Sequence, residues 1–288
     1  MDYVHWHDRP KLKRPVLVAA FEGWNDAADA ATSAARFLRD HWAARQFAEI
    51  DPEEFYDFSA TRPQVRLVDG LTREIVWPAN ELYAASIPGG ERDVIVLLGV
   101  EPGLKWRTFS TQIVDVGREL GVELFLTLGA LLADVPHTRP VRVTGTAADA
   151  ELVQRLGLQR SRYEGPTGIV GVLHDAFSKA KVPSASLWAA VPHYVAATPS
   201  PKATLALVER ASELLGSSVP TTALEIAAAS YERQVSEVVE SDDDVSEYVH
   251  RLEETSDDGD EDDEEMELTS GDALAADFER YLREQQGD

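Results

Sequence analysis

Side chains that can exchange protons or bind anions follow four of the strands that the sequence predicts. The candidate catalytic acids and bases are Glu22, His137 and His193. A second set of candidates would bind a ligand beside them: Gly23, Trp24, Asn25, Asp26, Glu101, Lys105, Trp106 and Arg139. In a parallel sheet the turns that follow the strands open on one edge, so we expect these residues to converge there. Glu22 or His137 would then move a proton while Arg139 holds an anion.

These residues also have explanations that involve no chemistry. Asn25 and Asp26 are good helix N-caps, and Gly23 suits a tight turn. The tryptophans can cover the open end of the sheet, and a single loop histidine more often makes a hydrogen bond than catalyses a reaction. Both explanations stay open, although capping and turn geometry do not account for Glu22.

Motifs that bind nucleotides or metals are absent from the sequence. It contains no Walker P-loop, no G-x-G-x-x-G, no G-x-S-x-G and no H-E-x-x-H pattern. It has no cysteine, and therefore no disulfide, no thiolate metal ligand and no cysteine nucleophile. His5 and His7 alone are a weak metal signal because a third ligand is missing. We expect neither a metal nor a cofactor.

The elements that must position these residues alternate along the chain. Apolar runs of strand length are Val16–Phe21, Val94–Val100, Leu124–Leu128, Val141–Thr144 and Ser186–Val191. The helix-like stretches between and after them are Ala27–His41, Thr108–Leu120, Asp149–Leu156, Gly168–Lys179 and Lys202–Leu215. This alternation predicts an α/β core domain over residues 1–220, with a mainly parallel or mixed sheet flanked by helices.

Residues 53–87 interrupt that alternation. Short strand-like runs predict an antiparallel excursion there, with turn chemistry at Asp69 and Gly70. The runs are Phe55–Phe58, Val65–Val68, Glu74–Trp77 and Glu81–Ile87.

Acidic charge is concentrated near the C-terminus. Of the formal net charge of −24, residues 237–267 contribute 17 acidic side chains against the single base Arg251. Because an acidic tail repels phosphate and no basic patch is visible, nucleic acid is not an expected partner. The N-terminal residues lack the apolar stretch of a signal peptide, and no apolar run reaches the roughly 20 residues of a membrane span. Together with the lack of cysteine, this predicts a cytoplasmic protein without a membrane contact.

The sequence pattern changes near residue 221. Apolar residues then recur every seven positions and predict a long heptad-like helix over 221–254, which the acids at 241–244 can split: Leu224, Tyr231, Val238, Val245 and Leu252. The helix is free to pack on a second copy of itself, on another subunit or on its own domain. Residues 255–270 are too acidic to order, which predicts a disordered linker. Residues 271–286 predict an amphipathic terminal helix that either docks on a partner or packs back on its own domain. Its candidate partner-binding face consists of Leu274, Phe278, Tyr281 and Leu282.

Several blocks, taken in order, resemble a known family. They read AFEGWNDAADAA, GVEPGLKWRTF, LLADVPHTRPVRVTG, YEGPTGIVGVL, SLWAAVPHYV and SPKATLALVERASELLG. Over about residues 10–250 they resemble the bacterial branch of the proteasome assembly chaperone two family, and the acidic linker with its last helix resembles the long-tailed members. The resemblance implies a phosphorylase- and hydrolase-like α/β fold with a C-terminal helical extension, and homo-oligomers with trimers among them. It supplies no established catalytic residues.

Some relatives in that family bind proteasome subunits through a C-terminal hydrophobic–Tyr–any-residue tail. This sequence ends with Glu284, two glutamines, Gly287 and Asp288. We therefore do not expect it to enter a proteasome pocket by that route.

Two hypotheses of function follow from the sequence. The first is a non-enzymatic assembly or scaffold protein, a homo-oligomer and by expectation a trimer, that binds a protein partner through its C-terminal helices. The second is a phosphorylase- or hydrolase-like enzyme that uses the strand-end residues on a small anionic or nucleoside-like ligand. The two are distinguished by whether Glu22, Glu101, His137 and His193 line one pocket.

Overall fold

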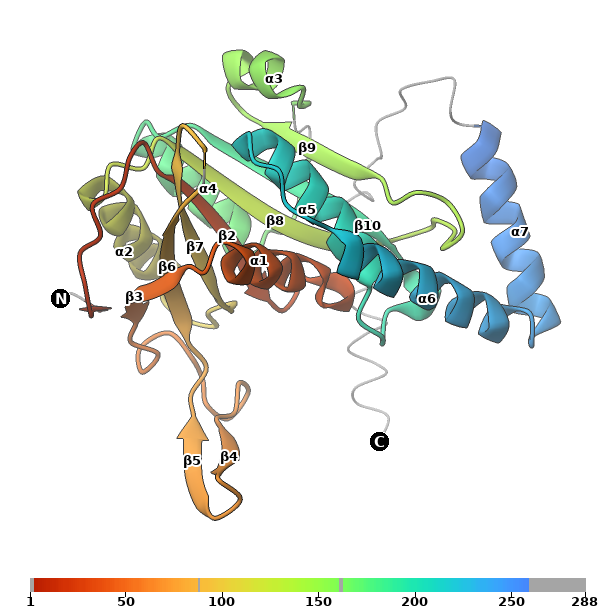
Figure 1. The fold of residues 1–288 in the computed structure, drawn as a ribbon, viewed down its shortest axis with the longest axis horizontal. Coiled ribbons are helices and arrows are strands. Elements are labelled where there is room, and N and C mark those ends of the chain that lie inside the picture. The colour runs from red at the N-terminus through yellow and green to blue at the C-terminus, as the bar shows by residue number, and fades with distance from the viewer. Residues whose placement is uncertain (1–2, 88, 161–162, 259–288) are drawn as a thin grey trace.

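Helices cover both faces of an eight-stranded sheet in the computed structural model, which describes residues 3–87, 89–160 and 163–258 (Figure 1). The strands of this sheet are β1 Val4–Trp6, β2 Val16–Glu22, β3 Arg45–Ile50, β6 Asn80–Ser86, β7 Asp93–Val100, β8 Leu124–Ala133, β9 Val143–Ala147 and β10 Ser184–Pro192. Their order across the sheet is β1-β3-β6-β7-β2-β8-β10-β9. The central strands β7, β2, β8 and β10 run parallel, and the flanking strands are antiparallel to their neighbours. The predicted α/β fold with a mixed sheet is confirmed.

The helices divide between the two faces of the sheet. They are α1 Ala30–His41, α2 Trp106–Glu119, α3 Ala150–Leu156, α4 Ile169–Lys179, α5 Pro201–Leu215, α6 Thr222–Val239 and α7 Asp243–Asp258. Val18 of β2 packs with α1 and α5 in one core, whereas Leu17 and Phe21 pack with α2 and α4 in the other. A strand buried on both faces has no polar side to show, which is why β2 is a continuous apolar run.

The connections that follow the neighbouring strands β2 and β7 run to opposite faces of the sheet. β2 leads into α1 on one face of the sheet, and its neighbour β7 leads into α2 on the other. In open α/β sheets a crevice at such a point is the usual place for a ligand. The fold therefore brings the turns after β2 and β7 to one place.

Asp26 anchors the start of α1 from outside the helix. The short 3₁₀ helix Ala27–Asp29 separates it from α1, and Ala28 and Asp29 have left-handed backbone angles. The buried Asp26 carboxylate accepts hydrogen bonds from the amides of Ala31 and Thr32 at 2.7 and 3.1 Å and from the Thr32 hydroxyl. The Asp26 carboxylate is therefore the acceptor for two amides in the first turn of α1, where amides have no partner within the helix.

The region before β7 differs from the sequence-based prediction in two ways. Residues 55–58 form a turn rather than a strand, because Phe55 and Tyr56 are buried against the sheet instead of pairing with a neighbour. The edge strand β1 and its neighbour β3 had no counterpart in the prediction. The hairpin of β4 Gln64–Val68 and β5 Thr72–Val76 pairs apart from the main sheet. Its turn at Asp69 and Gly70 is confirmed, since both have the positive φ of a tight hairpin turn.

The strand predicted at 141–144 lies at 143–147 as β9, and it is an edge strand rather than a strand buried on both faces. It pairs antiparallel with β10. Its outer edge is partly covered where the amide of Ala147 donates to the carbonyl of Gln159 and the amide of Gln159 donates to the carbonyl of Gly145.

The heptad region contains two helices, α6 and α7, rather than one helix over 221–254. The Asp242 carboxylate accepts hydrogen bonds from the amides of Asp244 and Val245 at 3.1 and 3.2 Å, so it caps α7 and ends the run of α6. Helix α7 continues to residue 258, where the linker was predicted to begin at 255. The rest of the predicted linker and the terminal helix at 271–286, with Leu274, Phe278, Tyr281 and Leu282, lie outside the described residues.

Removing the Asp26 carboxylate is expected to destabilise the fold. Asp26→Ala leaves two helix amides and a buried hydroxyl without their acceptor, which should cost about 2 kcal/mol and lower the Tm by about 4–8 °C. Asp29→Asn is the control, because the Asp29 side chain makes no capping bond and Asn tolerates the left-handed conformation. Thermal unfolding followed by circular dichroism measures both, and equal Tm values for the two variants would contradict the anchoring role.

Candidate functional site

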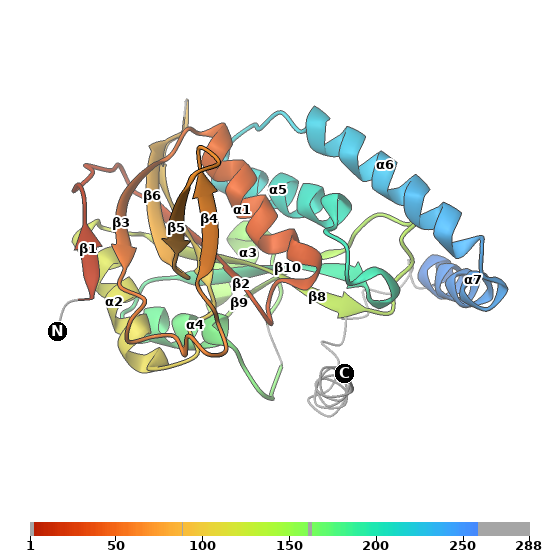
Figure 2. The ribbon, with the colours of Figure 1, turned by 90° about the horizontal axis from the view of Figure 1, so that it is seen from below.

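The structure places the sequence-predicted residues in two separate groups. Glu22, Gly23, Trp24, Asn25 and Glu101 meet at the ends of β2 and β7, and we call this group the strand-end turn. His137, Arg139 and His193 lie beyond the ends of β8 and β10, against α6 and α7. Figure 2 shows both helices at that end of the sheet.

Glu101 is the most enclosed carboxylate of the strand-end turn. Its Oε1 accepts a hydrogen bond from the amide of Ile169, at the start of α4, at 2.7 Å and lies 3.5 Å from the side-chain amide of Asn25. Burial raises its pKa, although hydrogen bonds from the amides of Ile169 and Trp24 act in the opposite direction. A Cβ on Gly168 would lie within 2.7 Å of the side-chain ends of Asn25 and Glu101, so a larger residue there would have to displace them. Glu101 thus holds α4 against the turn after β2.

The other polar residues of this region are also engaged within the chain. Glu22 forms an ion pair with Arg36, and the carbonyl of Asn25 accepts the amide of Ala130 at 2.9 Å. Lys105 pairs with Glu54, and the Trp106 indole donates to the carbonyl of Pro102. Gly23 has a φ of 124°, which explains glycine at this turn. Trp24 is left 45% exposed.

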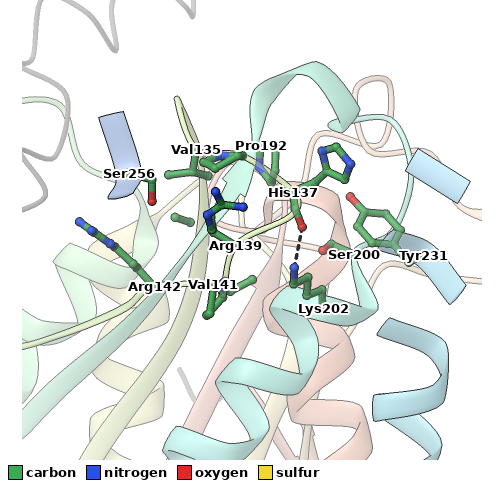
Figure 3. Close-up of a pocket in the computed structure, with 13 residues that line it drawn as sticks. Val135, His137, Arg139, Val141, Arg142, Pro192, Ser200, Lys202, Tyr231 and Ser256 are labelled. Atoms are coloured by element: carbon green, nitrogen blue, oxygen red, sulfur yellow. Dashed lines mark hydrogen bonds between the residues drawn. The ribbon is translucent and has the colours of Figure 1, made fainter. Parts of the chain in front are cut away.

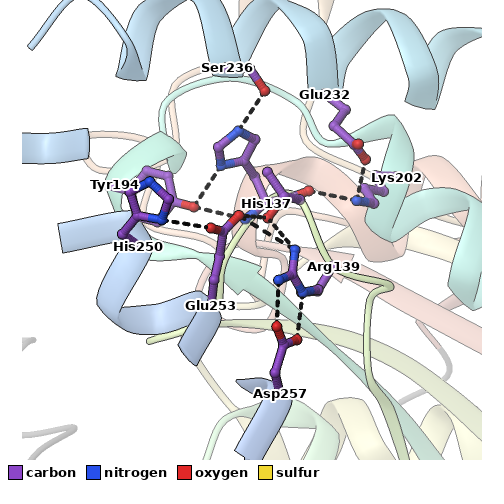
Figure 4. Close-up of polar contacts among 10 residues, drawn as sticks. His137, Arg139, Tyr194, Lys202, Glu232, Ser236, His250, Glu253 and Asp257 are labelled. Atoms are coloured by element: carbon purple, nitrogen blue, oxygen red, sulfur yellow. Dashed lines mark hydrogen bonds and ion pairs between the residues drawn. The ribbon is translucent and has the colours of Figure 1, made fainter. Parts of the chain in front are cut away.

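His137 is the centre of a buried polar network (Figure 4). Its Nδ1 lies 2.9 Å from the Tyr194 hydroxyl, and its Nε2 lies 3.0 Å from the Ser236 hydroxyl on α6. Its carbonyl accepts a hydrogen bond from the Lys202 ammonium at 2.5 Å, and Lys202 also pairs with Glu232 of α6. Burial and then the Lys202 charge lower the pKa of His137, so the neutral ring is favoured.

Arg139 ties α7 to the body of the protein. Its guanidinium donates to both carboxylate oxygens of Asp257, at 2.7 and 2.6 Å, and lies 3.5 Å from Glu253. The Thr138 hydroxyl donates to Glu253 as well. These paired bonds raise the pKa of Arg139 and lower that of Asp257. We call α6, α7 and their contacts with residues 134–139 the clasp.

His193 lies in the clasp, beside Asp134 and Tyr248. Its Nδ1 lies 3.1 Å from a carboxylate oxygen of Asp134, and its ring meets those of Tyr194 and Tyr248 edge-on. The Tyr248 hydroxyl of α7 donates to the same Asp134 oxygen at 3.1 Å. Few apolar side chains support these contacts, chiefly Val249 of α7 against Tyr231, Val235 and Val239 of α6.

The clasp covers a small cavity (Figure 3). Its volume is about 20 Å³, and its lining includes His137, Arg139, Ser200, Lys202 and Tyr231 but not Glu22, Glu101 or His193. A space of this size holds about one water molecule, whereas small-molecule sites usually measure about 300–1,000 Å³. The described residues also contain no cluster of three or more side chains that could hold a metal ion.

The partners of His137 and Arg139 could not be found from the sequence. Ser236 and Asp257 lie 99 and 118 positions away from them, and no local pattern links such positions. The only signal was the position of 137 and 139 after a predicted strand. The arrangement holds α6 and α7 against the residues that follow β8.

Most of the described fold matches a known protein family. A family model described as the PAC2 family matches residues 20–239. The chain belongs to the PAC2 family. The match begins within β2, extends through α6 and ends before α7.

Several solved structures are similar to this PAC2 family chain. The Mycobacterium tuberculosis proteasome-assembly chaperone homologue Rv2125 is 48% identical, with a TM-score of 0.74 over 81% of this chain and 99% of that chain. A PAC2 family protein from Streptomyces avermitilis is 46% identical, with a TM-score of 0.75 over 82% and 99%. Pyrococcus furiosus PbaB, an archaeal proteasome activator, is 19% identical and shares the fold, with a TM-score of 0.67 over 82% and 97%. No curated protein matches the sequence.

Breaking the Arg139 contacts is expected to loosen α7. Arg139→Met keeps the apolar stem of the side chain but removes the donors to Asp257 and Glu253, so amides of residues 243–258 should exchange hydrogen faster. Arg233→Met is the matched control, because Arg233 is exposed on α6 and donates only weakly to Ser230. Hydrogen exchange read by mass spectrometry compares them. Unchanged exchange in α7 would show that Arg139 does not hold the clasp.

Acid is expected to destabilise the protein through its buried histidines. Burial lowers the pKa of His137, and it lowers the pKa of His174 to about 4. In the unfolded chain both histidines have the ordinary pKa of about 6.5. Below that pH the unfolded chain therefore binds protons that the folded chain does not. The stability that these two neutral histidines contribute is therefore fully present well above pH 6.5 and is lost as the pH falls below it.

Lowering the pH from about 7.5 to about 5.5 should thus lower the Tm, and His137→Gln or His174→Gln should reduce the size of that drop. His41→Gln, at an exposed position, serves as the control. A drop of the same size in all four proteins would refute the assignment to the buried histidines.

Proposed function

We propose that this PAC2 family protein is a non-enzymatic assembly or scaffold protein that forms a homo-oligomer and binds a protein partner. The observation that carries the proposal is its 48% identity, over 81% of the chain, with a protein described as a proteasome-assembly chaperone homologue. The fold it shares with an archaeal proteasome activator supports the same class of function at a greater distance.

The use of polar residues in the structure supports a binding role over catalysis. Glu22 pairs with Arg36, Glu101 binds the start of α4, and Arg139 binds α7. Each of these contacts holds elements of the fold together. A catalytic group must instead face a space that a substrate can enter. The cavity beside His137 and Arg139 has room for about one water molecule.

The clasp is the part of the chain suited to a partner. It is held mainly by polar contacts, carries the acidic side chains of α7 and leads into the acidic residues that follow position 258. Elements held by few apolar contacts open at low free-energy cost, and regulatory contacts are drawn from them. We propose that the partner is bound through α6, α7 and the amphipathic sequence at 271–286. The resemblance of the sequence favours a trimer.

An enzyme of the phosphorylase or hydrolase type is the second candidate function. One observation favours it: Glu101, with its raised pKa, lies at the point of the sheet where such folds bind ligands. Its test is a thermal-shift screen with nucleosides and inorganic phosphate, because a ligand of the native state must raise the Tm. A shift that Glu101→Gln abolishes would favour the enzyme over the scaffold.

Comparing the full chain with a chain ended after residue 258 tests the partner-binding role. This end point keeps Asp257 and therefore the clasp. Crosslinking and pull-down from cell extract, together with purified proteasome subunits as a directed probe, should recover a specific partner with the full chain and less of it with the shorter one. Identical partner sets would remove the terminal segment from the proposal, and no specific partner for either chain would contradict a scaffold function. Among the described residues, no helix has the length and apolar character of a membrane span.

A further inference from the structure

The hairpin formed by β4 and β5 is the most exposed apolar part of the described residues. Figure 1 shows it standing away from the eight-stranded sheet. Every residue of both strands is exposed. We call residues 62–77, which include the hairpin and the segments that join it to the body, the arm.

The two faces of the arm differ in chemistry. Val65 is paired with Ile75 and Leu67 with Arg73, so these side chains share one face. Trp77, two residues beyond Ile75, continues the alternation, and its ring meets Phe58 edge-on at the base of the arm. The opposite face holds Gln64, Thr72 and the ion pair between Arg66 and Glu74 at 2.8 Å, together with Val68 and Val76.

The described residues leave most of the apolar face of the arm uncovered. Val65, Leu67, Ile75 and Trp77 are 49–59% exposed, and Leu71 at the tip is 88% exposed. Apolar residues on one face and polar residues on the other are the pattern of an antiparallel sheet that packs on a core. A two-stranded hairpin is marginal alone in water, and exposed apolar patches of this kind mark interaction surfaces. The arm therefore has the composition of a segment that is covered in the assembled protein.

The distribution of charge along the chain favours a second copy of this chain as the partner that covers the arm. The arm carries three arginines, Arg62, Arg66 and Arg73, against Asp69 and Glu74, for a net charge of +1 in a chain of −24. The body of another copy is acidic, so the arm is attracted to it, whereas two arms repel each other and so do two bodies. Contact between copies is thus favoured where an arm meets a body.

The strand-end turn offers a matching surface on that body. Trp24 and Leu104 are 45% and 47% exposed. Both flank Glu101: the amide of Trp24 donates to its carboxylate, and Leu104 follows three residues later. Glu22 and Glu54, which each pair with one cation on this side, add carboxylates around the two apolar side chains. The two apolar side chains, with the Glu101 carboxylate between them in the chain, complement an apolar face that carries Arg73.

We propose that the apolar face of the arm packs on the strand-end turn of a second copy, around Trp24 and Leu104. Such a contact joins two different surfaces, so each copy uses its arm on one neighbour and its strand-end turn on the other, which closes into a ring when the rotation permits. The inference rests on the proposed homo-oligomer and names its interface. It also gives the exposed tryptophan after β2 a role that needs no substrate.

Paired serine variants test the arm. Val65→Ser with Ile75→Ser removes the apolar face and should convert the oligomer to monomers in native mass spectrometry and sedimentation velocity. Val68→Ser with Val76→Ser, on the opposite face of the same strands, is the matched control and should leave the oligomer intact. Circular dichroism checks that both variants stay folded. A wild-type monomer would overturn the homo-oligomer itself, whereas an oligomer that survives in the first variant would overturn only the role of the arm.

Complementation tests the direction of the contact. Trp24→Ser with Leu104→Ser should also give monomers, because it removes the receiving surface. Mixing this variant with the Val65→Ser, Ile75→Ser variant should restore one contact, since one copy retains an intact arm and the other an intact strand-end turn. Heterodimers, resolved by isotope labelling of one variant, are the expected result. An arm-to-arm interface gives no heterodimer, and a mixture that stays monomeric would overturn the proposal.

Discussion

Burial of β2 on both faces is the constraint on which the rest of the structure depends. Because its side chains alternate between two apolar cores, α1 and α5 must cover one face and α2 and α4 the other. The chain then changes face between β2 and β7, and the turns after these strands are brought together. The position of Glu22 beside Glu101 follows from this arrangement and not from any local signal.

The polar groups at the strand ends are satisfied by the chain itself. Asp26 binds the first turn of α1, Glu101 binds the first turn of α4, and Arg139 binds α7. Buried polar groups without partners are costly, so the polar side chains at these strand ends take their partners from within the chain. In this protein those partners are helix amides and the acidic side chains of the clasp. The same residue types that suggest catalysis in the sequence thereby hold the layers together.

Two features, the arm and the clasp, extend from the parallel core. The arm leaves the sheet between β3 and β6 and is apolar on one face, whereas the clasp follows α5 and is acidic. PAC2 family relatives cover the core and the start of the clasp, and an archaeal activator shares that fold at low identity.

The sequence by itself determined the parallel core, the hairpin turn and the family. Continuous apolar runs such as Val16–Phe21 and short-range signals such as Asp69-Gly70 depend on interactions between near neighbours, which a sequence records directly. Tertiary structure alone decided that 55–58 is a buried turn, that β1 and β3 extend the sheet, and that His137 and Arg139 meet Ser236 and Asp257. Those contacts join positions about a hundred residues apart, and their pairing depends on where the packed cores place each element rather than on any local pattern.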